Sequence, residues 1–316
     1  MRQFIRNLLL FFISFLALVL VIILFETIII NHQGKFRLEG KEKYIFLGHS
    51  HAQMAYDDKI IDSALNQASS GEAYFYTYIK LKKILENNSD RKVVFVEYSN
   101  NNIVREMNDW IWDDIHILER YKLYTAYIPG KEFEFLVSKN PKSTLLCQIR
   151  SVINNAYYIL RPKNIKADSM MGGYVYLVRD KTDSLLKASA GGTKKNTDTG
   201  VSYENIRYLK KIIDLCKIYG VQVYLIRSPL HPKYDGFANE RDFEKLLHND
   251  LNGAEFLDFK DYPLPDSDYG DLEHVNYRGA KKYSVFFNSL IKKGLLQQTD
   301  KQKFIDEQMA FERKNL

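Results

Sequence analysis

Cysteine, proline and glycine are all scarce in this chain, with 2 Cys, 7 Pro and 16 Gly among 316 residues. Two cysteines exclude a disulfide-stabilised scaffold, and no Cys-x-x-Cys pair or Cys/His spacing indicates structural zinc. The low Pro and Gly content excludes collagen-like and proline-rich low-complexity chains. With 27% charged and 46% hydrophobic residues, the chain is expected to fold around a sizeable core.

A strong excess of one charge is also missing. The 45 basic and 39 acidic residues leave a formal charge of +6. There is no basic run interleaved with stacking aromatics, no zinc finger and no helix-turn-helix signature. A nucleic-acid partner is therefore not expected.

One long apolar stretch lies near the N-terminus. No charged residue occurs between Leu8 and Phe25, and Ile28 to Ile30 continue the stretch. A helix needs about 20 apolar residues to cross a bilayer. Because no Ala-x-Ala-like cleavage site follows, an uncleaved signal anchor is favoured over a removed signal peptide. Residues 8–30 are therefore predicted to hold the chain in the cytoplasmic membrane as a single-pass protein.

The charges beside this stretch do not agree on its orientation. Arg2 and Arg6 precede it and favour a cytoplasmic N-terminus under the positive-inside rule. Four basic residues follow it and argue the other way: Lys35, Arg37, Lys41 and Lys43. Large following domains translocate largely regardless of such charge. The body is therefore expected on the extracytoplasmic side.

The rest of the chain alternates between two kinds of pattern. Short apolar runs typical of buried strands occupy residues 44–47, 92–97, 221–226 and 254–258, and helical spacing occupies 72–86, 203–219, 240–248 and 276–290. Such alternation predicts a parallel sheet covered on both faces. The predicted fold class is a three-layer α/β/α domain with a mainly parallel, flavodoxin-like sheet, plus an N-terminal transmembrane helix.

The predicted domain organisation follows from these patterns. It comprises an anchor at 1–32, a linker at 33–42, an α/β domain at 43–296 and a charged, solvated helical tail at 297–316. Within the domain, residues 103–200 form a helical and loop insertion. Its polar part, residues 163–199, fits either a lid over the site or an ordinary surface loop, and the surface loop is favoured.

The chemistry-bearing residues are expected where strands end, because ligands bind there in such sheets. Ser50 follows the first predicted strand, after Gly48, and a serine hydroxyl needs a base within reach to act as a nucleophile. Asp271 and His274 follow the last strand, and their spacing puts both on one side of a turn. The alternatives are that Ser50 only caps a helix and that Asp271 and His274 are a surface ion pair.

These motifs resemble those of the SGNH/GDSL hydrolase superfamily. Gly48-His49-Ser50 is similar to its Gly-Asp-Ser block, and Asp271-Leu-Glu-His274 matches its Asp-x-x-His block. The following residues 275–280 look like the His-Leu-Asn-x-x-Gly pattern of its membrane-anchored branch. That branch includes relatives of alginate O-acetyltransferases and of the D-alanyl-transfer protein of teichoic acid synthesis. The resemblance covers about residues 43–296, with the insertion unmatched.

The resemblance implies roles for particular residues. Ser50 would be acylated, His274 would be its base, and Asp271 would orient the histidine. The implied oxyanion hole consists of the Ser50 amide, Gly71 and an asparagine after the second predicted strand, for which Asn101 is the choice among several. His49 stands where the family has an aspartate.

Three further histidines are candidates for substrate binding: His49, His51 and His231. A metal-dependent site around His49 and His51, with His231 or His274, is an alternative. No helical His-x-x-x-His or carboxylate ligand pattern supports it, so neither a metal nor a cofactor is expected.

The function implied by the resemblance is a membrane-anchored serine esterase or O-acyltransferase. Its partners would be an acylated cell-surface glycan or another ester substrate, and a membrane partner in an envelope-modification system. The alternative is a catalytically inactive SGNH-fold protein that binds or assembles surface polysaccharide.

Overall fold

The computed structural model describes residues 1–32, 36, 38, 40–88, 92–160, 172–179, 181–182, 184 and 200–314. The chain divides into two compact units. The first comprises residues 1–37 and 112–167, and the second comprises residues 38–111 and 168–316. Each is described by itself.

The first unit is helical. Its helices are α1 (Arg2–His32), α6 (Asp114–Tyr124), α7 (Gly130–Lys139) and α8 (Pro141–Leu160). The C-terminal end of α1 is anchored to the loop after α6, because the Asn31 side-chain amide donates to the Ala126 carbonyl at 2.8 Å. Ile30, Leu136 and Cys147 contribute buried side chains to this unit.

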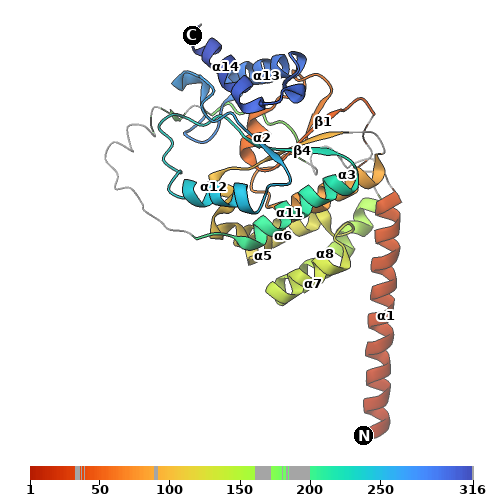
Figure 1. Cartoon of the computed structure of the whole chain (residues 1–316). Coiled ribbons are helices and arrows are strands. Elements are labelled where there is room, and N and C mark those ends of the chain that lie inside the picture. The colour runs from red at the N-terminus through yellow and green to blue at the C-terminus, as the bar shows by residue number, and fades with distance from the viewer. Residues whose placement is uncertain are drawn as a thin grey trace. The chain divides into compact units, whose positions relative to one another are not determined.

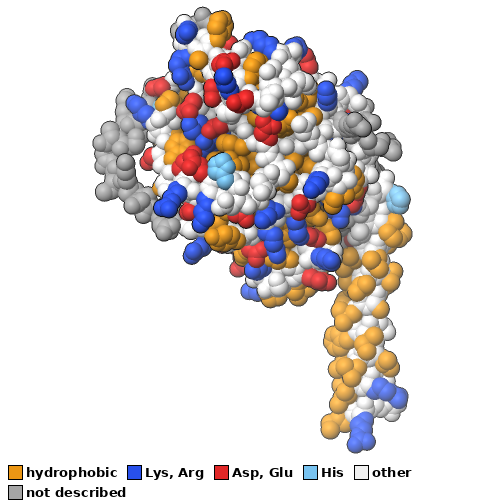
Figure 2. All heavy atoms as spheres, viewed as in Figure 1, with side chains coloured by type: hydrophobic (Ala, Val, Ile, Leu, Met, Phe, Trp, Pro, Cys, Tyr) orange, Lys and Arg blue, Asp and Glu red, His pale blue; other side chains and the backbone are white. Residues whose placement is uncertain are grey.

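Helix α1 is apolar on all sides over most of its length. Among the described residues it is the one helix long and apolar enough to cross a membrane. None of its most apolar window is buried within the protein, and Figure 2 shows hydrophobic side chains along it with basic ones at its N-terminal end. A helix that is hydrophobic all round belongs in a core or a bilayer. The predicted N-terminal membrane-spanning helix is confirmed in length and composition.

The second unit contains a five-stranded, all-parallel sheet. Its strands are β1 (Tyr44–Leu47), β2 (Ala64–Asn66), β3 (Val93–Glu97), β4 (Gln222–Arg227) and β5 (Glu255–Asp258). Their order across the sheet is β2-β1-β3-β4-β5. This is the flavodoxin-like order, so the predicted sheet is confirmed.

Helices cover both faces of the sheet (Figure 1). Helices α3 (Tyr74–Asn87) and α11 (Tyr203–Ile218) pack together across one face. On the other face lie α2 (Ser50–Ala55), α13 (Tyr277–Lys292) and α14 (Lys301–Lys314). There the neighbouring strand residues Phe46, Phe95 and Tyr224 stack side by side, and Phe287 of α13 packs on the first two. The predicted three-layer class is confirmed.

One further helix of the second unit is α12 (Glu240–Asn249). The other described elements are short helical turns: α4 (Asn100–Ile103), η1 (Arg105–Asn108), α5 (Asp109–Trp112), η3 (Asp266–Asp268) and η4 (Leu295–Gln297).

Two local features differ from the sequence prediction. The tail helix α14 is not simply solvated, because Ile305 and Met309 are buried in the same core cluster as residues of α13. Strand β2 was not predicted. Of the polar loop 163–199, residues 172–179, 181–182 and 184 are described and the others lie outside the described residues.

Candidate active site

Ser50 lies at the carboxyl end of β1, where the chain turns sharply into α2. The turn passes through Gly48 in a left-handed conformation, with φ of +126°. A Cβ at Gly48 would come within 2.6 Å of the Glu97 Cβ on β3, so a glycine is required there. The cap position of α2 belongs to His49, whose ring accepts the His51 amide. The Ser50 hydroxyl is therefore not used as a helix cap.

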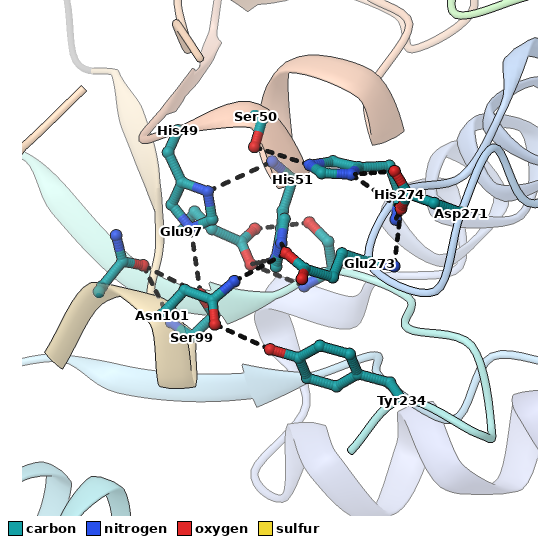
Figure 3. A network of polar contacts seen from close by, with 12 residues as sticks. His49, Ser50, His51, Glu97, Ser99, Asn101, Tyr234, Asp271, Glu273 and His274 are labelled. Atoms are coloured by element: carbon teal, nitrogen blue, oxygen red, sulfur yellow. Dashed lines mark hydrogen bonds and ion pairs between the residues drawn. The ribbon is translucent and has the colours of Figure 1, made fainter. Parts of the chain in front are cut away.

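The structure brings the three predicted triad residues together (Figure 3). The Ser50 Oγ lies 2.8 Å from His274 Nε2. On its other side, His274 Nδ1 lies 2.9 and 3.1 Å from the two carboxylate oxygens of Asp271. A proton on Nδ1 bonds to the carboxylate, which leaves Nε2 as an acceptor for the serine proton.

The Asp-x-x-His spacing produces this geometry locally. Asp271 Oδ1 accepts the backbone amides of Glu273 and His274, each at 2.8 Å, which closes a tight turn. Two residues later Asn276 caps α13 through its side-chain oxygen. The turn and the cap together hold the imidazole over the end of β1. Both Asp271 and His274 are partly buried, so they are not a free surface ion pair.

The surroundings favour a neutral imidazole. Burial lowers the pKa of His274 to about 4, the Glu273 carboxylate opposes this shift, and Arg179 adds to it. At neutral pH, His274 is therefore unprotonated and able to accept a proton.

Arg179 reaches the site from a part of the chain that sequence patterns did not connect with it. Its guanidinium contacts the Asp271 carboxylate. The segment before it is held by backbone hydrogen bonds, with the Val175 amide donating to Gln53 O at 3.1 Å and the Tyr277 amide donating to Leu177 O at 2.9 Å. Residues 172–179 thus run alongside α2 and the start of α13.

Besides Ser50, the two other residues predicted for the oxyanion hole occupy different surroundings. Gly71 follows β2 in a loop that is bonded to the Ser50 turn, because the Ser69 amide donates to Gly48 O at 2.9 Å. A Cβ at Gly71 would overlap the ring of Trp110 at 2.2 Å. Asn101 joins the polar network of Figure 3, but its side-chain amide donates to Glu273 at 3.0 Å and its oxygen accepts from Tyr234 at 2.8 Å.

The three histidines predicted to bind substrate also have different surroundings. His49 is buried, and its Nε2 lies 3.0 Å from the Ser99 hydroxyl. His231 is buried, its Nε2 lies 3.1 Å from Asp266 Oδ1, and its backbone amide donates to the Leu272 carbonyl at 3.1 Å. His51 lies beside the triad, with its ring 5.1 Å from that of His274.

A buried carboxyl group lies beneath the site. Glu97 ends β3, is fully buried, and accepts hydrogen bonds from the amide and the hydroxyl of Ser228, at 3.1 and 2.5 Å. Burial raises the pKa of Glu97 to about 8, although the Ser228 hydrogen bonds oppose the shift.

Sequence reasoning thus missed three ionisable groups: Glu97, Arg179 and Glu273. Two of them carried a usable signal, because Glu97 ends an apolar strand at the ligand edge and Glu273 lies inside the Asp-x-x-His block. Nothing in the local pattern marked Arg179.

A comparison with family models gives one match, to an uncharacterised family over residues 185–296. The matched range includes β4, β5 and the turn that carries Asp271 and His274. No curated protein matches the chain.

Proposed function

We propose that this protein is a membrane-anchored SGNH-type serine esterase or O-acyltransferase acting on acylated cell-surface glycans. The observation that carries the proposal is the continuous hydrogen-bonded line from Ser50 through His274 to Asp271. The class of substrate comes from the family resemblance.

The proposed reaction follows from this line. As Ser50 Oγ attacks the ester carbonyl carbon, its proton passes to His274 Nε2. The imidazolium, paired with Asp271, then protonates the departing alcohol, and the acyl group remains on Ser50. Water or a sugar hydroxyl next attacks this acyl-enzyme, gives its proton to His274 and restores the serine. Water yields hydrolysis, whereas a sugar hydroxyl yields acyl transfer.

Charge on the tetrahedral intermediate requires hydrogen-bond donors near the carbonyl oxygen. By the resemblance, these are the backbone amides of Ser50 and Gly71 together with the Asn101 side chain. In the structure that asparagine amide donates to Glu273. An amide NH₂ has two hydrogens, so Asn101 can take part through its second N–H while the first stays bonded to Glu273.

A serine-directed fluorophosphonate probe tests the proposal. The full-length chain in detergent is expected to be labelled, and Ser50→Ala is expected to lose labelling, because the probe bonds to an activated serine oxygen. Ser289→Ala is a matched control on α13, where the hydroxyl donates to the Phe286 carbonyl. Labelling is read by in-gel fluorescence and folding by circular dichroism.

Two results would count against the enzyme. Equal labelling of wild type and Ser50→Ala would place the reactive serine elsewhere. No labelling of a folded wild type would favour the inactive surface-polysaccharide protein.

The proposed substrate also requires the second unit to lie outside the cytoplasmic membrane. A C-terminal alkaline phosphatase fusion, which is active only when exported, is therefore expected to be active in cells. A fusion to a fluorescent protein that matures only in the cytoplasm is the reciprocal control. Fluorescence with no phosphatase activity would reverse the orientation and remove the glycan substrate.

A further inference from the structure

His51 is a buried histidine in α2, next to Ser50. It is 2% exposed, and neither ring nitrogen has a hydrogen-bond partner among the described residues. Buried polar groups are nearly always paired, and an unpaired one costs about 1–3 kcal/mol. The His51 ring nitrogens are therefore available to bind a ligand.

Carboxylates face both nitrogens of this ring. Nδ1 lies 3.9 Å from Glu97 Oε1, and Nε2 lies 3.7 Å from Glu273 Oε2. These separations are too long for hydrogen bonds. The separation between His51 Nε2 and Glu273 Oε2 is close to the spacing of two ligand atoms that share one ion, since zinc bonds of about 2.0–2.1 Å place tetrahedral ligand atoms about 3.4 Å apart.

His274 completes a set of three ligands. His51, Glu273 and His274 each offer one ligand atom, and these atoms lie within 4.8 Å of one another. Two imidazoles and a carboxylate form a ligand set known from catalytic zinc sites. The Glu273 side chain is 43% exposed, so an ion can reach the three ligand atoms from solvent beside Glu273. His51 is buried.

Two further residues lie next to the proposed ligands, in positions from which such residues commonly orient metal ligands. Metal-binding histidines commonly turn their second nitrogen toward a carboxylate, which is the position of Glu97 relative to His51 Nδ1. On the other side, Asn101 donates to Glu273 Oε2 at 3.0 Å and orients that carboxylate.

A second set, His49 with His51 and Glu97, is also close enough to hold an ion. It is fully buried, and both nitrogens of His49 are engaged, one by the Ser99 hydroxyl and one by the His51 amide. The set containing Glu273 is therefore the better site.

We propose that His51, Glu273 and His274 bind a divalent transition-metal ion of the zinc class, and that the bound ion withdraws His274 from Ser50. Asp271 holds His274 Nδ1, so Nε2 is the nitrogen left to bind the ion. A lone pair that coordinates a metal cannot also accept the serine proton. The second half of this proposal rests on the proposed function.

Direct binding tests the site. Equilibrium dialysis of the full-length chain in detergent against Zn²⁺ is expected to show one bound ion. His51→Gln and Glu273→Gln should each weaken binding by at least about tenfold. His248→Gln, which alters an exposed histidine on α12, should bind as wild type does. Glu273→Gln covers the case in which the buried His51 variant does not fold.

Absence of bound Zn²⁺, or binding unchanged in a folded Glu273→Gln variant, would overturn the site. Labelling by the fluorophosphonate tests the competition separately: Zn²⁺ should slow it and EDTA should restore it. Bound Zn²⁺ with unchanged labelling would refute the competition. If the chain is never labelled, the proposed function fails, and dialysis still decides whether the metal site exists.

Discussion

Replacing His274 with glutamine is expected to lower kcat/KM for ester hydrolysis by about 10³- to 10⁴-fold. Glutamine can still form a hydrogen bond with Ser50, but its amide cannot accept a proton at neutral pH. The serine would then attack without a base, and the leaving alcohol would depart without an acid. Steady-state hydrolysis of p-nitrophenyl acetate by the full-length protein measures the loss.

The matched control is His248→Gln, the same substitution on the exposed face of α12. It should retain the wild-type rate, because this side chain is exposed on α12 and does not contact the triad residues. Activity of His274→Gln within tenfold of wild type, with folding intact, would mean that another group serves as base. The hydrogen bond at 2.8 Å between Ser50 and His274 would then be structural.

Most of the sheet could be predicted from short apolar runs. A parallel strand covered on both faces must be apolar throughout, and β1 and β3 are fully buried in this way. Strand β2 has three residues, Ala64 to Asn66, which is too few to show a period. Helix α14 looked solvated because its buried stripe is sparse, with Ile305 and Met309 the apolar members among many charges.

The candidate site could be predicted where its geometry is local. Asp271 and His274 are joined by one tight turn, and Ser50 follows a strand and a glycine that needs positive φ. The family resemblance supplied the pairing between these distant segments. Their catalytic roles remain a prediction until the labelling and kinetic experiments are done.

The rest of the site depends on tertiary contacts that leave no local pattern. Arg179 reaches Asp271 because residues 172–179 form backbone hydrogen bonds with α2 and α13 and Tyr176 stacks on Tyr277, contacts that no local sequence pattern predicts. Likewise, the hydrogen bond between Asn101 and Glu273 forms only because the turn after β5 is packed against the segment that follows β3. A helical spacing rule cannot find contacts between segments that lie this far apart in the sequence.

Glu97 is expected to make the protein less stable as pH rises from about 5 to about 8. In the folded state its pKa is raised from 4.5 to about 8, so the buried group keeps its proton while the unfolded chain loses it. Folding must then take up a proton, which lowers the free energy of unfolding by about 1.4 kcal/mol for each pH unit in this range. Below the unfolded-state pKa, both states are protonated and the penalty vanishes.

Glu97→Gln should remove this pH dependence. Glutamine mimics the protonated acid, because its oxygen can accept the Ser228 amide while its NH₂ donates to the Ser228 hydroxyl. Urea unfolding of the full-length chain, followed by tryptophan fluorescence from pH 5 to 8, should show wild type losing a few kcal/mol relative to the variant. The nearby histidines titrate in both proteins and therefore largely cancel in the difference.

Glu244→Gln is the control, because that glutamate is exposed on α12 and its removal should leave the wild-type pH slope unchanged. If Glu97→Gln and wild type differ by a constant amount across the range, Glu97 does not hold a proton in the folded state. The carboxylate beside His51 would then be charged, with its charge balanced by another group. The slope of the free energy of unfolding against pH therefore shows whether Glu97, buried beneath the candidate site, is neutral or anionic.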